Sequence, residues 1–134
     1  MIFTVSELLT NTIDEEALEH VKSEKIDLDP VYIHFTSGST GVPKGVVVGH
    51  RSIIDFIAIF TKEFQITKED VIANQAPFDF DVSVKDIYSS FCVGATLVIV
   101  PKEFFSSPAI LLDYLVDYKI TTMIWAVSAL CLIT

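Results

Sequence analysis

The sequence predicts an α/β fold in which a mostly parallel sheet is flanked by helices. Apolar residues make up 51% of the chain, and they come in short blocks separated by charges, Gly and Pro, as in a buried core. After residue 45, segments rich in Val, Ile and Leu alternate with helix-like segments, the order typical of parallel sheets covered on both faces. A chain of 134 residues forms one domain or a part of one.

Residues 1–30 form an acidic lead-in. Within it, the segment 14–22 carries acids in its first turn and a lysine near its end. A helix dipole favours this charge order, so we predict a short helix there. Asp29-Pro30 then predicts a break. We therefore place a boundary here, with residues 31–134 forming the α/β part.

The elements after this boundary follow from local patterns. Helices are predicted over residues 50–64, 83–93 and 108–119, where one face is apolar. Gly94 is expected to end the second of these helices. Strands are predicted from β-branched and aromatic runs at residues 31–35, 45–49, 70–77, 95–101 and 121–127. Residues 128–134 begin a further apolar element without a cap, which indicates a domain truncated at its C-terminus.

Charge and composition disfavour several function classes. The net charge of −9 argues against binding to nucleic acid or to an anionic membrane, since both require clustered Lys and Arg. The longest uncharged stretches have 15 residues, fewer than the roughly 18 to 20 that span a bilayer, and no secretory signal is evident. Cys92 and Cys131 stand in apolar runs, so we predict buried thiols in a reducing cytoplasm.

Gly, Ser and Thr crowd around Pro43 and Lys44 in the stretch 36–46, "TSGSTGVPKGV". Such small residues let backbone N–H groups converge on an anion while the lysine adds positive charge, which suits a polyphosphate. The order Pro43-Lys44-Gly45 excludes a Walker A loop, in which Ser or Thr follows the lysine. Composition alone leaves open a surface turn between two strands, which is built from the same residue types.

The order of residues in this stretch resembles the signature of the adenylate-forming, or AMP-binding, enzyme superfamily at every fixed position. The resemblance implies that the loop binds the phosphates of ATP together with Mg²⁺. His50 would match a histidine that follows the loop, and we expect it to be structural. The phosphate-binding residues that the resemblance implies are Thr36 at the base of the loop, Ser37, Gly38, Ser39, Thr40, Gly41 and Lys44.

A second polar group, in "APFDFDVSVKDIY" (76–88), combines three aspartates with Lys85. The lack of a nearby His or Glu disfavours a metal site, and we assign none. The residues alone leave another interpretation open, in which Asp81 or Ser83 caps a helix. Lys85 and Asp86 would then be solvated surface charges.

Residues 80–84, "FDVSV", resemble a segment of the amino-acid-activating members of the superfamily, the nonribosomal peptide synthetase adenylation domains and the D-alanyl carrier protein ligases. The resemblance implies that Asp81 pairs with the α-ammonium group of the substrate. It also implies pocket positions for Val82, Lys85 and Trp125. A lysine in the pocket would suit a polar or acidic side chain better than D-alanine. A surface lysine and a buried core tryptophan are the alternatives.

The resemblance covers about residues 25–134 and implies a part of an ATP-dependent ligase. This ligase would join an amino acid to AMP, release pyrophosphate, and pass the aminoacyl group to the phosphopantetheine thiol of a carrier protein. The family's hinge and C-terminal lysine are not in this sequence, so we predict an inactive isolated chain. We also predict self-association through an apolar face at the truncated end. A fragment of an acyl-CoA or aryl-acid ligase and a non-catalytic α/β scaffold are the alternatives.

Overall fold

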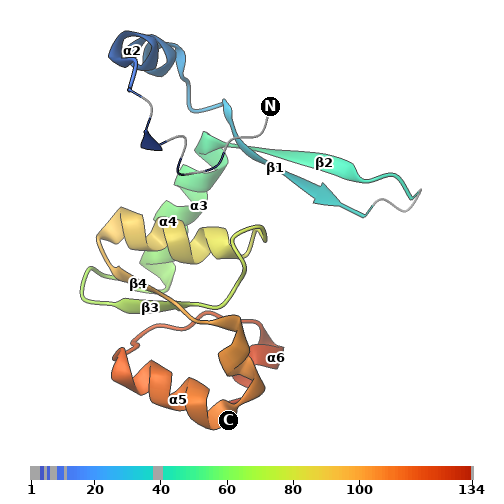
Figure 1. Cartoon of the computed structure of the whole chain (residues 1–134), viewed down its shortest axis with the longest axis vertical. Helices are drawn as coiled ribbons and strands as arrows, with labels where there is room; N and C mark the ends of the chain where they lie inside the picture. Colours follow the sequence, from blue (N-terminus) through green and yellow to red (C-terminus); the bar gives the residue numbers. More distant parts are fainter. Residues whose placement is uncertain (1–3, 5, 7–8, 11, 38–40, 134) are drawn as a thin grey trace.

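The predicted N-terminal helix is present in the computed structural model. Helix α2 (Glu15–Glu24) has no buried residue and stands apart from the rest of the chain (Figure 1). The Asp14 carboxylate caps it by accepting a hydrogen bond of 2.9 Å from the backbone N–H of Ala17. Acids lie in its first turn and Lys22 in its last, so the charge order that predicted the helix also stabilises it. The structure describes residues 4, 6, 9–10, 12–37 and 41–133.

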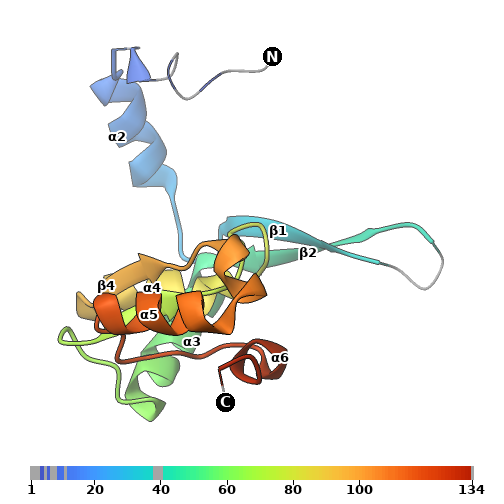
Figure 2. The same ribbon diagram turned by 60° about the horizontal axis from the view of Figure 1, so that its bottom comes forward.

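Strands β1 (Pro30–Thr36) and β2 (Lys44–Gly49) form a hairpin that projects away from the helices (Figures 1 and 2). Both strands occur where the sequence predicts them, and they pair antiparallel. The ladder ends with Thr36 opposite Lys44. Most side chains of the hairpin are exposed, so the pairing between its own strands is the main interaction that maintains it.

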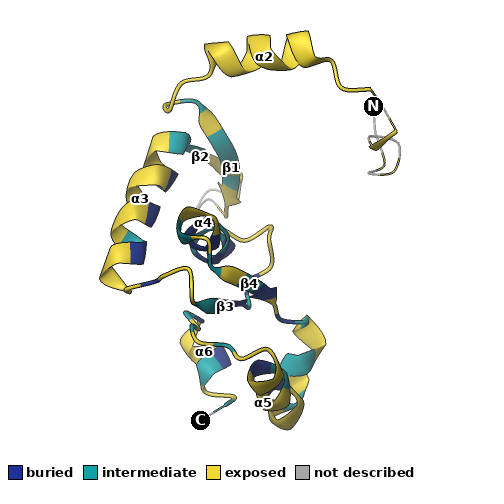
Figure 3. Ribbon diagram, turned by 90° about the vertical axis from the view of Figure 1, so that its left-hand side faces the viewer, coloured by how far each residue is buried: buried dark blue, intermediate teal, exposed yellow. Residues whose placement is uncertain are grey.

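Strands β3 (Val71–Asn74) and β4 (Thr96–Ile99) pair in parallel at the centre of the α/β part. The crossover between them contains α4 (Ser83–Val93), which begins and ends where the sequence predicts it. Gly94 closes this helix in the left-handed conformation, with φ of 77°. Helix α3 (His50–Glu63) packs against α4 on the same side of the sheet (Figure 3).

The prediction of a strand at 121–127 is wrong, because the segment forms one isolated parallel bridge, between Ile72 and Thr122. The backbone N–H of Ala73 donates to the Thr122 carbonyl at 3.0 Å. The Ala73 carbonyl, however, accepts from the indole N–H of Trp125 at 2.7 Å. Since a side chain occupies the acceptor that a longer ladder would use, the pairing stops after one bridge.

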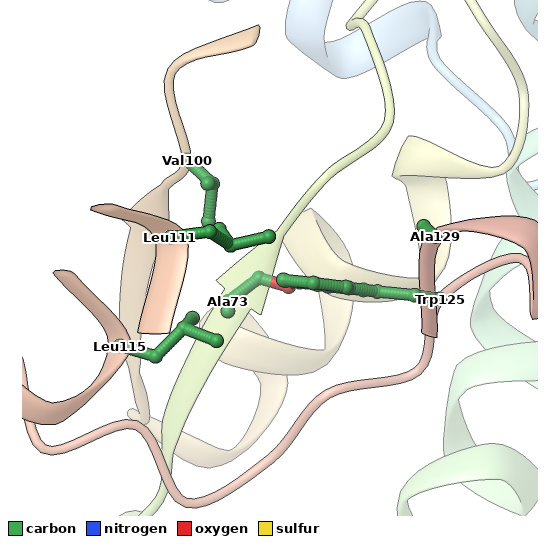
Figure 4. Packing of buried hydrophobic residues seen from close by; sticks show 6 residues of the cluster. All are labelled: Ala73, Val100, Leu111, Leu115, Trp125 and Ala129. Atoms are coloured by element: carbon green, nitrogen blue, oxygen red, sulfur yellow. Dashed lines mark hydrogen bonds between the residues drawn. The ribbon is translucent and has the colours of Figure 1, made fainter. Parts of the chain in front are cut away.

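Helix α5 (Pro108–Asp117) covers the other face of the β3–β4 sheet (Figure 3). It follows the 3₁₀ helix η1 (Lys102–Ser106), and α6 (Val127–Leu130) lies near the C-terminal end. Helices therefore cover both faces of the parallel pair, as the sequence predicts. Within the described residues, no helix combines the length and the apolar character needed to span a bilayer. The buried cluster on this side of the sheet contains Ala73, Val100, Leu111, Leu115, Trp125 and Ala129 (Figure 4).

Both cysteines are exposed, which corrects the prediction that they are buried. Cys131 directly follows the short helix α6. Cys92 lies on α4, which packs on β3. The apolar residues around Cys92 in the sequence do not form the face of α4 that makes this contact. The buried positions of α4 are instead polar, namely Ser83, Asp86, Ser89 and Ser90.

Candidate functional site

The loop rich in glycine and hydroxyl residues connects the two strands of the hairpin. At its base, the Thr36 hydroxyl donates to the Lys44 carbonyl at 3.4 Å. Gly41 has a φ of 81°, and no atom lies within 4 Å of the position of a Cβ. The backbone conformation rather than crowding therefore requires glycine there. Ser37 is exposed. Three of the predicted phosphate-binding residues lie outside the described residues, namely Gly38, Ser39 and Thr40.

Lys44 presents its charge to the space around this loop. It is exposed, and no carboxylate of the described residues lies within 4.0 Å of its ammonium group. An unpaired ammonium group beside a glycine-containing turn is an arrangement that can bind an anion. Phosphate binding by this loop stays a prediction.

A cavity of about 370 Å³ lies between β1 and the segment that leads into α4. One wall comes from residues 31–34 of β1 and the other from the "FDFDVSV" segment, so the cavity joins the second motif to the strand that precedes the glycine-rich loop. The ring of His34 contacts that of Phe80 edge-on, with the ring centroids 6.2 Å apart. The polar side chains that line the cavity are Tyr32, His34, Asp79, Asp81, Ser83 and Tyr88.

Asp81 is exposed and lines this cavity. Helix α4 begins at Ser83 with Val82 in the N-cap position, and no side chain accepts a capping hydrogen bond. The interpretation of Asp81 or Ser83 as a helix cap is therefore wrong. Val82 lines a neighbouring cavity of about 450 Å³ together with Asp79.

Tyr32 faces Asp81 across this cavity. Burial, and then the negative charge of Asp81, raise the pKa of the Tyr32 phenol above its ordinary value. The phenol consequently keeps its proton at neutral pH and can donate a hydrogen bond. The cavity thus offers a carboxylate acceptor and a hydroxyl donor on opposite walls.

Lys85 and Asp86 form a buried ion pair with a distance of 2.8 Å between Nζ and Oδ1. Their side chains are 14% and 1% exposed, so the interpretation of both as solvated surface charges is wrong. The side-chain amide of Asn74 donates to the other carboxylate oxygen at 3.1 Å. Burial raises the pKa of Asp86, while Lys85 and Asn74 oppose that shift. The ammonium group of Lys85 is therefore bound by Asp86, and its place in a substrate pocket stays a prediction.

Trp125 lies in the apolar core, with 8% of its surface exposed. Its ring packs against that of Phe105 at 5.3 Å between centroids, and its indole N–H bonds to Ala73 (Figure 4). This position agrees with the alternative of a buried core tryptophan. Whether Trp125 also contacts a substrate stays a prediction.

Two features of the site are not evident from the sequence. A cavity of about 670 Å³ lies at the carboxyl ends of β3 and β4, where ligands of parallel sheets commonly bind. Among its described lining residues, Lys102 alone is charged. Asp79 lines two cavities. Asp79 is two residues from Asp81, and this spacing could have indicated that both side chains line the same cavity.

Among the described residues, no three His, Cys, Asp or Glu side chains are grouped as metal ligands.

Comparison with known proteins identifies related sequences. The family model described as "AMP-binding enzyme" matches residues 4–133. The chain is 39% identical to vanchrobactin synthetase VabF from Vibrio anguillarum, over 74% of this chain and 4% of that protein. It is 41% identical to the L-proline--[L-prolyl-carrier protein] ligase from Pseudomonas fluorescens, over 72% of this chain and 19% of that protein. It is 43% identical to the D-alanine--D-alanyl carrier protein ligase from Bacillus cytotoxicus, over 61% of this chain and 16% of that protein.

Solved structures resemble the chain over most of its length. The adenylation domain AlmE from Vibrio cholerae, in complex with glycyl-adenosine-5'-phosphate, gives a TM-score of 0.72 at 30% identity, over 87% of this chain and 22% of that one. A fatty acyl-adenylate ligase from L. pneumophila gives a TM-score of 0.62 at 27% identity, over 72% of this chain and 18% of that one. These likenesses confirm the predicted α/β fold class. The chain spans at most 19% of the length of the sequence relatives described above.

Proposed function

The chain belongs to the AMP-binding enzyme family, and on that premise we propose that the protein carrying it activates an amino acid with ATP. A carboxylate oxygen of the amino acid attacks the α-phosphorus of ATP, and pyrophosphate leaves with the electrons of the broken P–O bond. The thiol of a carrier protein's phosphopantetheine then attacks the aminoacyl carbon, and AMP leaves. This two-step reaction takes place in the cytoplasm, where ATP is available.

The observation that carries the proposal is the position of Asp81 in a cavity shared with the hairpin. In its ionised form this carboxylate accepts a charge-assisted hydrogen bond from an α-ammonium group, which a plain carboxylic acid lacks. The carrier-protein ligases among the relatives, which act on proline and D-alanine by name, support an amino-acid substrate.

The hairpin loop would hold the phosphates of ATP. Lys44 and Ser37 are exposed at its ends, and Gly41 adopts a positive φ, which suits a tight turn of the kind that binds anions. Mg²⁺ would accompany ATP and offset the charge of its phosphates. We assign it to none of the described residues, since they contain no cluster of ligands suited to a metal.

Amino-acid-dependent exchange of labelled pyrophosphate into ATP tests the proposal in the complete protein. We expect Asp81→Asn to lower kcat/KM by about 10- to 100-fold, the loss of one charge-assisted hydrogen bond. Asp113→Asn, on the exposed side of α5, is the matched control and should leave exchange unchanged. Full exchange activity in the Asp81→Asn variant would contradict the role of this residue.

The likeness to a fatty acyl-adenylate ligase favours a second candidate, a ligase for acids without an amino group. Hexanoate and norleucine differ by the α-amino group alone, so exchange assays with this pair separate the two. A higher exchange rate with hexanoate than with norleucine would identify the protein as a ligase for acids without an amino group. A non-catalytic scaffold would bind neither ATP nor an aminoacyl-sulfamoyl adenosine in calorimetry.

We further propose that the 134-residue chain does not catalyse the reaction by itself. The support is its coverage of its relatives, at most 19% of their length in the three comparisons above. Pyrophosphate exchange by the purified chain with any amino acid would disprove this part of the proposal.

A further inference from the structure

Asp79 and Asp81 line the same cavity of about 370 Å³, between β1 and the start of α4. Asp79 also lines the adjoining cavity with Val82 and Ala126. Among the described residues, neither carboxylate has an ion-pair partner within 4.0 Å. Two negative charges thus face one space without an internal counter-charge.

The cation nearest in sequence does not neutralise this cavity. The Lys85 ammonium group lies 2.8 Å from Asp86, in a pair that is almost fully buried and is held further by Asn74. Breaking such a pair would leave Asp86 charged and unpaired in the interior, which is strongly unfavourable. His34 lines the cavity and adds a positive charge only when it is protonated. The field in the cavity therefore favours a cationic ligand.

An unpartnered hydroxyl group points independently to a ligand. Ser83 is only 2% exposed and lines this cavity, and its hydroxyl makes no hydrogen bond with any described residue. A polar ligand in the cavity would provide this hydroxyl with a hydrogen-bond partner. The protonated phenol of Tyr32 lines the opposite wall.

We propose that Asp79 is a second substrate-binding carboxylate and that the substrate is an amino acid with a second ammonium group on its side chain. This inference rests on the proposed function, because Asp81 takes the α-ammonium group there. Asp79 is exposed and stays hydrated beside a neutral side chain, whereas a side-chain ammonium group forms a charge-assisted hydrogen bond with it. A volume of about 370 Å³ lies within the range of small-molecule pockets.

The test compares ornithine with norvaline, and lysine with norleucine, in pyrophosphate exchange by the complete protein. Each pair has the same carbon chain and differs by the terminal ammonium group. We expect the wild type to favour the diamino acid of at least one pair by about tenfold or more in kcat/KM, the effect of one charge-assisted hydrogen bond. Asp79→Asn should abolish that preference while leaving kcat/KM for the neutral partner within about twofold.

Controls keep this inference separate from the function on which it rests. Asp113→Asn should keep the wild-type preference. Exchange with neutral amino acids only, or an equal loss for both members of a pair in Asp79→Asn, would overturn the role of Asp79 while amino-acid activation stands. Absence of exchange with every amino acid, together with exchange stimulated by hexanoate, would overturn the proposed function itself. A loss in Asp79→Asn that is restored by raised Mg²⁺ for all substrates would assign Asp79 to the metal instead, and would also overturn the inference.

Discussion

The hairpin and the remainder of the α/β part, built on the parallel strands β3 and β4, meet at one cavity but are built in opposite ways. The hairpin is mostly exposed, and its main interactions join its own two strands. The α/β part packs helices on both faces of β3 and β4 and buries the ion pair of Lys85 and Asp86. The difference matches the two tasks that we propose for these regions. An anion-binding loop needs accessible backbone, whereas a site that distinguishes substrates needs side chains held by packing.

The largest expected effect on the free energy of unfolding comes from a change beside the β3–β4 sheet, whereas a change in the hairpin should have little effect. Asp86→Ala leaves Lys85 charged and unpaired at a position only 14% exposed, which should lower the free energy of unfolding by about 3 to 5 kcal/mol. Val47→Ala, at an exposed position of β2, should change it by no more than about 0.5 kcal/mol. Urea unfolding of both variants measures the contrast.

A matched control isolates the buried pair from the loss of a carboxylate as such. Asp113→Ala removes an exposed aspartate from α5 and should behave like Val47→Ala. Equal destabilisation by Asp86→Ala and Asp113→Ala would mean that the pair contributes nothing in solution.

An intermediate effect is expected in the loop of the hairpin. Gly41→Ala introduces a Cβ at a φ of 81°, which should cost about 1 to 2 kcal/mol and distort the turn that we propose as the ATP-binding loop. Gly41→Asn is the control, because asparagine tolerates this conformation far better. ATP affinity by calorimetry should fall several-fold in the first variant and less in the second. Equal affinities in both variants would show that the turn does not position the nucleotide.

The smallest effect concerns the junction of β3 with the segment that follows α5. Asp70 accepts hydrogen bonds from the backbone N–H of Thr67 and from the hydroxyls of Thr121 and Thr122, which lower its pKa to about 2. Because the pKa of the folded state is lowered, this stability is present above the ordinary value of about 4 and is lost as the pH falls towards 2. Solvent screening limits the contribution to about 1 kcal/mol.

Unfolding free energies of the wild type and Asp70→Asn, measured from pH 7 to pH 2, check this junction. The difference between them should be constant above about pH 4 and shrink below it. A difference independent of pH across this range would exclude the ionised carboxylate as its source.

Much of the fold could be predicted from local patterns. The helix over 83–93 and its glycine stop are where the sequence places them, because periodicity and the left-handed conformation are properties of neighbouring residues. The two strands of the hairpin were predictable for the same reason. The loop between them was recognisable from residue order alone, and its family is confirmed.

The burial of particular side chains could not be predicted in this way. The sequence places Asp86 beside Lys85 but does not show that Asn74, twelve positions away, completes their enclosure. Nor does it show that Trp125 bonds to Ala73 across 52 positions and ends the strand pairing.

The sequence by itself determined the helices α2 to α5, most of the strands and the AMP-binding motif, since each depends on residues that are close together in the chain. Only the tertiary structure decided that α4 packs through polar residues, that Cys92 faces solvent, and that Asp79 and Asp81 share a cavity with the hairpin. The physical reason is that burial and pairing depend on which distant segments come together. Local periodicity limits that choice but does not make it.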